Sequence, residues 1–398
     1  MKKFWKICST ASFFICLLLL GLAFWGEKKL PDSYSTADGK PPLNGIFTAT
    51  AEEGTMNAFA DSDAGTAEMT YDVKLWNVIP VKTVSVQLSA RRYLAVGGEL
   101  VGVKLKTEGV LVVGTEPFTA ADGRSADPAA QAGIRKGDTL ISLNGLPIGS
   151  NDELISAIEQ SGGAPLSVLL ERGGQKRTVT LTPQKTAATG LYKGGLWVRD
   201  STVGVGTLTF CDIETGRIAA LGHGIYDTDT GGLLQISSGE ICTATVASVK
   251  KGAAGAPGEI TGALGANTLG SITANSEDGI YGDLYYMDSE PELYPVATFS
   301  EVHTGAAQIV CTVTDGEKQT YDIEIVKITG SEAEAKMTVK ITDPALTAIT
   351  GGIVQGMSGS PILQDGMLAG AVTHVFVNDP NYGYAVFAQS MLERTTTE

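Results

Sequence analysis

Closely spaced glycines between short apolar segments constrain the fold of this chain most, from residue 190 to the C-terminus. Glycine supplies 49 of the 398 residues, and it is the residue that most readily forms the tight turns between successive strands. The segments 203–210 and 217–221 predict a hairpin around Glu214-Thr215-Gly216. Further strands are expected at 241–249, 294–297, 307–313, 321–328, 335–341 and 367–377. Because no long helical pattern interrupts them, residues 190–398 predict a two-sheet or two-barrel β domain.

The first 26 residues have the character of a membrane-targeting segment. Three lysines precede an apolar run over residues 11–25, which is short for a spanning helix and long for a signal-peptide core. No small-residue cleavage site follows the run, so an uncleaved signal-anchor helix over residues 1–26 is expected. The lysines before the run favour an N-terminus on the cytoplasmic side of the membrane. The bulk of the chain would then lie outside the cytoplasm.

Residues 27–70 lack hydrophobic periodicity and are rich in Ala, Gly, Thr, Asp and Glu. This composition predicts a solvated, flexible tether where the chain could be cut. From residue 71 to 88 apolar and polar residues largely alternate, which predicts strands at the start of a folded region.

The composition argues against nucleic acid as a partner and gives no sign of a metal site. The formal net charge is −15, whereas binding to nucleic acid needs clustered positive charge. Cys211, Cys242 and Cys311 are an odd and widely separated set, which favours buried apolar thiols over a disulfide framework. Neither a Cys-x-x-Cys nor a His-x-x-x-His spacing occurs, so no metal site is predicted.

A second pattern of short elements covers residues 94–183. A short helix is expected at 127–134, with Pro128 at its start and Gly133 near its end. An amphipathic helix is expected at 151–160, and a hairpin joins 166–170 to 177–181. The run Ala-Gly-Ile-Arg-Lys-Gly-Asp-Thr-Leu-Ile-Ser-Leu-Asn-Gly over residues 132–145 resembles the signature of a bacterial PDZ domain. We therefore expect residues 71–185 to hold a strand region and a PDZ domain of the α+β class.

The PDZ resemblance implies a peptide-binding edge. Such a domain takes an extended peptide, usually a C-terminus, as an added strand. By resemblance this edge is the apolar strand made of Val101, Gly102, Val103, Lys104 and Leu105. The alternative is that this strand pairs with other segments of the same chain.

A loop near the C-terminus has the composition of a nucleophile loop. Gly356 and Gly359 bracket Ser358, and Pro361 begins an apolar strand. In chymotrypsin-like proteases a loop of the form Gly-x-Ser-Gly-x-Pro presents a serine, and the N–H groups of that serine and of the glycine two before it stabilise the oxyanion. Those oxyanion-hole groups would belong to Gly356 and Ser358. Ser360 is the rival nucleophile, and an ordinary Gly/Ser turn is the alternative without chemistry.

A catalytic serine needs a base, and the chain offers three histidines. His223 lies between two glycines at the end of a predicted strand, where a ring can face a cleft. His374 lies within an alternating strand and His303 in a loop or at a strand end. The pattern favours His223 and leaves the other two open.

The third catalytic group would orient the imidazole. Asp343 follows an apolar strand and precedes the serine loop, so it is the preferred acid. Asp227, Asp229 and Asp379 are the alternatives, although each lies in a sequence typical of a polar turn.

The combination of these features resembles the SpoIVB peptidases of endospore-forming bacteria, over about residues 71–391. It comprises an anchor, a PDZ domain placed before the protease domain, Ala-Leu-Gly-His-Gly at 220–224, the loop at 351–361, and Gly-Ala-Val-Thr-His-Val-Phe-Val-Asn-Asp-Pro at 370–380. By resemblance the catalytic residues are His223, Asp343 and Ser358. The interval from Asp343 to Ser358 is shorter than is usual in chymotrypsin-like enzymes, and Met357 stands where trypsin relatives carry aspartate.

The resemblance implies a mainly β protein in which a chymotrypsin-like two-barrel domain follows the PDZ domain. It implies a serine endopeptidase of endospore formation that needs no cofactor and acts between forespore and mother cell. Its expected substrates are its own N-terminal region, here residues 27–70, and an inhibitory membrane protein of an intramembrane protease that activates a late sigma factor. The PDZ domain would take part in self-recognition and substrate targeting.

Two other functions fit parts of the sequence. An HtrA-like envelope protease shares the two domain types, but it carries the PDZ domain after the catalytic domain. A catalytically silent PDZ adaptor would use the β domain only to display peptides.

Overall fold

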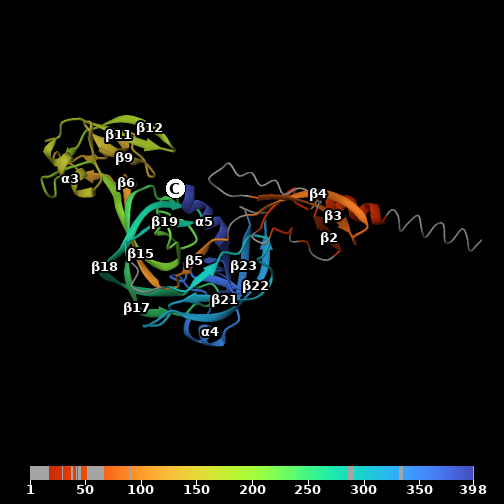
Figure 1. Cartoon of the computed structure of the whole chain (residues 1–398). Coiled ribbons are helices and arrows are strands. Elements are labelled where there is room, and N and C mark those ends of the chain that lie inside the picture. Colours follow the sequence, from red (N-terminus) through yellow and green to blue (C-terminus); the bar gives the residue numbers. More distant parts are fainter. Residues whose placement is uncertain are drawn as a thin grey trace, which may run out of the picture. The chain divides into compact units, whose positions relative to one another are not determined.

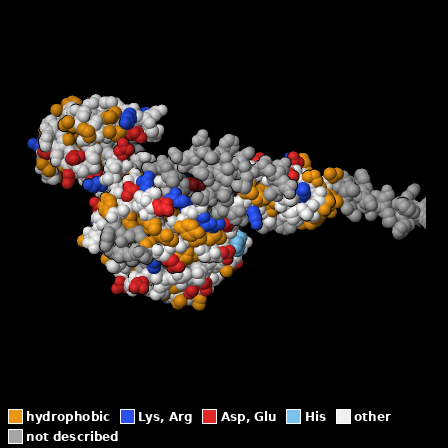
Figure 2. Space-filling view, in the orientation of Figure 1, with side chains coloured by type: hydrophobic (Ala, Val, Ile, Leu, Met, Phe, Trp, Pro, Cys, Tyr) orange, Lys and Arg blue, Asp and Glu red, His pale blue; other side chains and the backbone are white. Residues whose placement is uncertain are grey.

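The computed structural model describes residues 18–28, 30–36, 39–41, 43, 46–51, 67–88, 91–285, 291–330 and 335–397 (Figure 1). The chain divides into two compact units. The first unit comprises Met1–Arg92 and Pro295–His303, and the second comprises Tyr93–Tyr294 and Thr304–Glu398. The described part is mainly β, as the sequence predicted. On the face seen in Figure 2, acidic and basic side chains are interspersed.

The first unit contains a four-stranded sheet in the order β1-β4-β3-β2. Its strands are β1 (Ser33–Thr36), β2 (Phe47–Ala51), β3 (Ala67–Leu75) and β4 (Ile79–Leu88). β3 and β4 confirm the strands predicted within 71–88, and alternate residues such as Val73, Leu75, Val84 and Val86 form their buried face. Within residues 27–70, where the sequence predicted a flexible tether, β1 and β2 each pair with one of these strands, so these two segments belong to the sheet instead.

The signal-anchor prediction falls largely outside the described residues. Residues 18–28 are helical, and residues 1–17 lie outside the described part. Among the helices that the structure describes, none is both long and apolar enough to cross a membrane.

Six strands of the second unit close into a first barrel. Their order is β6 (Leu100–Thr115), β17 (Ile236–Lys250), β18 (Glu259–Ser276), β19 (Gly279–Leu284), β16 (Arg217–Ala220) and β15 (Leu196–Cys211), and β15 pairs again with β6. Alternate apolar residues, among them Val101, Val103, Ile218 and Ile241, fill the interior. The predicted hairpin between β15 and β16 is confirmed. β5 (Tyr93–Val96) pairs with the end of β15.

A second closed barrel follows, in the order β21-β22-β23-β26-β25-β24. Its strands are β21 (Gly305–Cys311), β22 (Gln319–Thr329), β23 (Lys336–Ile341), β24 (Pro361–Gln364), β25 (Met367–Val375) and β26 (Tyr382–Phe387). Helix α4 (Pro344–Thr350) precedes the serine loop, and α5 (Ala388–Thr397) ends the chain. The two-barrel expectation is therefore confirmed. β20 (Leu293–Pro295) is a further short strand of the chain.

The PDZ elements form a lobe at the far ends of β6 and β15 (Figure 1). They are β7 (Phe118–Thr119), β8 (Ser125–Ala126), α2 (Pro128–Gln131), β9 (Thr139–Leu143), β10 (Leu146–Pro147), α3 (Asn151–Gln160), β11 (Leu166–Arg172), β12 (Gln175–Leu181), β13 (Gln184–Lys185) and β14 (Tyr192–Lys193). Their own apolar core includes Val110, Leu140, Leu154 and Val168. Asp138 of the signature is buried, and it forms a two-point ion pair with Arg172 at 2.6 and 2.7 Å.

The connection between PDZ lobe and barrel corrects two predictions. The first half of β6 and the second half of β15 are barrel strands, whereas their other halves pair within the lobe. The PDZ domain is thus inserted into the first barrel rather than placed before it. The predicted peptide-binding edge, Val101 to Leu105, is a barrel strand paired with β15 on one side and β17 on the other. With both edges occupied, it cannot accept an added strand.

Candidate active site

A cavity of about 460 Å³ contains Ser358, His223 and His374. Residues 202–205 and 221–225 reach it from the first barrel and its loops, and residues 353–358 and 373–377 reach it from the second. The two barrels therefore meet around the residues that the sequence indicated for chemistry.

The serine loop depends on two glycines with positive φ angles. Gly356 has φ 100° and Gly359 has φ 93°, values that disfavour residues with a Cβ atom. A Cβ on Gly359 would also lie 2.1 Å from the carbonyl oxygen of Thr207. This close approach lets the loop pack directly on β15.

Two buried threonines of β15 hold the serine loop in place. The Thr207 hydroxyl donates to the Gly356 carbonyl and the Thr209 hydroxyl donates to the Gly359 carbonyl, each at 2.8 Å. The Thr207 N–H also donates to the carbonyl of Ser358 at 2.9 Å. The first barrel therefore positions the loop that the second barrel carries. Sequence reasoning missed these residues, although two threonines at alternate positions of an apolar strand were a visible signal.

The expected oxyanion-hole groups are available within the loop. The N–H groups of Met357, Gly359 and Ser360 donate to backbone carbonyls. Within the described part of the chain, the N–H groups of Gly356 and Ser358 have no such acceptor. Two free donors beside a serine are what an oxyanion requires.

The Ser358 hydroxyl donates to the carbonyl of Thr373 at 2.6 Å. Thr373 lies where the pairing of β25 with β26 shifts register, between Val372 and Val375. This irregularity leaves the Thr373 carbonyl free to accept from the serine. Ser360 is fully buried beneath the loop, with its hydroxyl 3.5 Å from that of Thr207. Ser358, and not Ser360, faces the cavity.

His223 is oriented by the backbone of the next residue. Its Nδ1 atom lies 2.8 Å from the Gly224 carbonyl oxygen. A carbonyl can only accept, so this contact requires the proton on Nδ1 and leaves Nε2 as a proton acceptor. Burial lowers the pKa of His223, and the hydrogen bond to Gly224 offsets only part of that effect. Leu221, two residues earlier, has a φ of 69°, which is unusual for a residue with a branched side chain.

His374 lies against His223. The two ring centroids are 4.3 Å apart, with an angle of 32° between the ring planes. Burial, together with the nearby His223 and Lys336, lowers the pKa of His374 to about 4. At neutral pH the second ring is therefore uncharged. The sequence pattern gave no sign of this ring pair.

Asp343 has a different role from the one expected. It precedes helix α4, and its carboxylate accepts from the N–H groups of Ala345 and Leu346 at 2.7 and 3.1 Å. It also accepts from the Asp322 N–H at 3.3 Å. These contacts lower the pKa of Asp343, with the Leu346 N–H contributing most. Asp343 does not line the cavity, so the structure places it as a helix N-cap and not beside His223.

The alternative aspartates and the third histidine also lie outside the cavity. Asp379 accepts from the backbone and side chain of Asn381 in a turn. Asp227 and Asp229 pair with Arg199. His303 belongs to the first unit and is not among the residues around this cavity. Among the described residues that line the cavity, no side chain is acidic.

A second cavity of about 660 Å³ lies on the PDZ lobe, between α3 and the segment from Leu191 to Val198. β15 begins within this segment and pairs there with β6 on one side. Within the described part, residues 196–198 have no strand on their other side, which faces α3. Ile155, Leu191 and Trp197 expose apolar surface here. This groove has the form of a strand-addition site.

Comparisons with known proteins give partial likenesses along the chain. A Neisseria meningitidis protein named as a zinc metalloprotease is 29% identical over 185 residues, 42% of this chain and 40% of that protein. Zinc metalloprotease RasP of Geobacillus kaustophilus is 36% identical over 62 residues, 16% of this chain and 15% of that protein. The chain thus spans less than half the length of these curated relatives.

Two solved protease structures are similar at low identity. The active form of the Rv3671c protease of M. tuberculosis matches with a TM-score of 0.32 and 12% identity, over 49% of this chain and 74% of that one. The thermostable serine protease AL20 of an extremophilic microorganism matches with a TM-score of 0.29 and 12% identity, over 49% and 92%.

Two protein families match parts of this chain. A PDZ domain family matches residues 123–172. The SpoIVB peptidase S55 family matches residues 190–392, just over half of the chain. Both matches confirm the resemblance that the motifs indicated. The chain therefore belongs to the SpoIVB peptidase S55 family of serine peptidases.

Proposed function

We propose that the chain is a serine endopeptidase in which Ser358 is the nucleophile and His223 the general base. One observation carries this proposal. The glycine-bracketed serine, the histidine and two free backbone N–H groups meet in one cavity between two closed barrels. Nucleophile, base and oxyanion donors are the minimum set for acyl transfer.

The chemistry follows from the hydrogen bonds. His223 Nε2 accepts the proton of Ser358 after the hydroxyl leaves the Thr373 carbonyl, and the serine oxygen attacks the peptide carbonyl. The N–H groups of Gly356 and Ser358 stabilise the resulting oxyanion. His223 then returns the proton to the leaving amine, and water hydrolyses the acyl-enzyme. The Gly224 carbonyl keeps the proton on Nδ1 and takes the orienting role that an aspartate has elsewhere.

The lining of the cavity supports a preference for apolar substrates. Its two histidines have lowered pKa values. Its other described side chains are uncharged, and most are Val, Ile, Leu or Pro. A charged substrate side chain would lose its hydration there without gaining a partner. We infer that peptides with apolar residues next to the cleaved bond are favoured.

Family membership supports a specific biological role. We infer that the enzyme acts in endospore formation, outside the cytoplasm, between forespore and mother cell. Its proposed substrates are its own N-terminal region and an inhibitory membrane protein of an intramembrane protease that activates a late sigma factor. The groove at Leu196 to Val198 would bind a peptide, either from another copy or from the substrate.

Self-cleavage of the full chain tests the enzymatic proposal. Wild type, Ser358→Ala and Ser360→Ala are compared on gels and by labelling with a fluorophosphonate. We expect fragments and label in wild type but neither in Ser358→Ala. Ser360→Ala tests the rival serine and should keep both if it folds. Equal cutting and labelling in all three would refute Ser358 as nucleophile and favour the adaptor function.

A further inference from the structure

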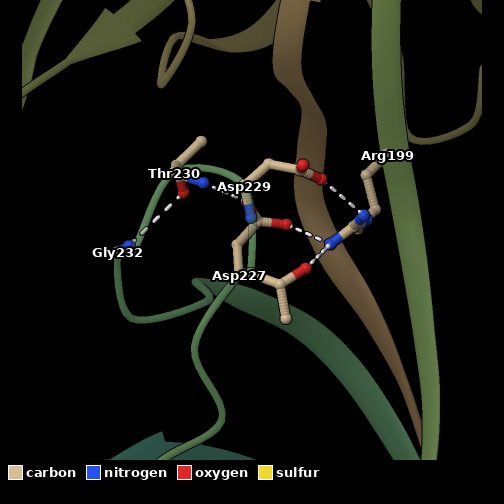
Figure 3. A network of polar contacts seen from close by, with 6 residues as sticks. Arg199, Asp227, Asp229, Thr230 and Gly232 are labelled. Atoms are coloured by element: carbon tan, nitrogen blue, oxygen red, sulfur yellow. Dashed lines mark hydrogen bonds and ion pairs between the residues drawn. The ribbon is translucent and has the colours of Figure 1, made fainter.

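Arg199 lies outside the cavity and pairs with two aspartates of the loop that follows His223. Arg199 lies on β15, at the irregularity between Arg199 and Ser201 where this strand passes from the PDZ lobe into the barrel. Its guanidinium bonds to Asp227 through Nη1 and to Asp229 through Nη2, the latter at 2.8 Å. Figure 3 shows both carboxylates turned toward this one guanidinium.

Asp227 organises the loop that follows His223. Its side chain is fully buried, and its Oδ1 atom accepts from the N–H groups of Asp229 and Thr230 at 3.1 and 2.7 Å. Its backbone N–H donates to the Gly232 carbonyl. A buried carboxylate is strongly destabilising without a partner, so the shape of this loop depends on Arg199.

The base of the same loop reaches the catalytic histidine. Asn275 of β18 accepts from the Ile225 N–H and donates to the carbonyls of Ile225 and Leu234, all within 2.9 Å. Ile225 directly follows Gly224, whose carbonyl fixes the Nδ1 proton of His223. Arg199 therefore holds the tip of this loop, and Asn275 holds the two ends where the loop leaves the barrel. The segment that they hold includes the residue next to Gly224, whose carbonyl orients the imidazole of His223.

The strand that carries Arg199 also supports the nucleophile. Eight and ten residues further along β15, Thr207 and Thr209 bond to the serine loop. Because one strand holds both the His223 loop and the Ser358 loop, it can fix their relative position. A displacement of about 1 Å in such a pair can lower the rate about 100-fold.

We propose that Arg199 is a positioning residue that sets His223 relative to Ser358 by clamping the Asp227 loop to β15. This inference rests on the proposed function of the same site. Arg199 does not line the cavity, so the affinity of the cavity for a small inhibitor should be unaffected by its replacement. The step that needs a correctly placed base should slow instead.

The test uses the full chain and measures inactivation by a fluorophosphonate, separating the maximal rate (kinact) from the inhibitor affinity (KI). Arg199→Gln should lower kinact about 10- to 100-fold with KI unchanged. Arg199→Lys retains one charge but not the forked geometry, and it should fall between wild type and Arg199→Gln. Arg217→Gln is the matched control, because Arg217 is similarly exposed (27% against 30%) and pairs with Asp283 in the same barrel. It should label as wild type does.

Folding is checked by circular dichroism and cooperative thermal unfolding. If Arg199→Gln does not fold, Arg199→Lys decides. A folded variant that labels at the wild-type rate overturns the positioning role while the protease proposal stands. An equal loss in Arg217→Gln overturns it as well, because the effect would then be general. A wild type that fails to label refutes the protease proposal itself.

Discussion

Asp343 directly precedes Pro344, the first residue of helix α4. Substitutions at Asp343 can distinguish a helix N-cap from a catalytic acid. Asparagine caps helices about as well as aspartate, whereas alanine costs about 1 kcal/mol of stability. We expect Asp343→Asn to keep activity close to wild type. Asp343→Ala should lower the free energy of unfolding by about 1 kcal/mol, measured by denaturant titration. Loss of a true triad aspartate costs about 10⁴-fold in kcat, so a fall of that size in Asp343→Asn would restore the triad assignment.

The protonation of His223 predicts the pH dependence of the reaction. Only the neutral ring can accept the serine proton, so activity is present above the pKa of His223 and is lost as pH falls through it. Burial lowers this pKa, so the acidic limb of kcat/KM should have its midpoint below about 6.5, the ordinary value for histidine. The measurement is the pH profile with an apolar peptide substrate. A midpoint at or above that value would contradict the environment described for His223.

The sequence predicted the roles of some site residues better than those of others. The glycines around Ser358 and His223 indicate loops with an unusual backbone conformation, and both residues do lie in one cavity. Asp343 could not be assigned in the same way, because Asp-Pro before a helix is also a typical capping sequence. The role of the Gly224 carbonyl was unreadable, since every residue has one.

Among the elements, β6 and β15 were the hardest to predict. Each has 16 residues, but bulges divide them into a barrel half and a PDZ half. The sequence pattern predicted only short parts of them, residues 101–105 of β6 and residues 203–210 of β15. Local alternation shows that a segment is a strand but not which neighbours it has. The PDZ resemblance indicated a peptide edge at Val101 to Leu105, and local alternation gave no sign of the distant segments that pair with this strand.

The groove along Leu196 to Val198 should bind a peptide through its apolar wall. A fluorescent peptide with an apolar C-terminal residue and a free carboxylate serves as the probe, and its anisotropy is measured on the full chain. Ile155 lines the groove and is 56% exposed, so Ile155→Glu should weaken binding at least about tenfold. Leu146→Glu is the control, since Leu146 is exposed on the same lobe outside the groove. Equal binding by both variants would place the peptide elsewhere.

For the whole molecule, the insertion of the PDZ domain determines which fragments can fold. The family match begins at residue 190, but the first barrel needs the β6 strand at residues 100–107 to close. A fragment of residues 190–398 would leave β15 and β17 with unpaired edges and expose the apolar interior around Ile218 and Ile241. Open apolar edges favour aggregation.

We therefore expect residues 190–398 to be insoluble or to lack a cooperative thermal transition. A fragment of residues 93–398 retains both barrels and the inserted lobe, so it should be soluble, unfold cooperatively and label at Ser358. Its Ser358→Ala variant controls for specific labelling. If residues 190–398 instead fold and label as well as the longer fragment, the β6 strand is dispensable, and the two domains are consecutive rather than nested.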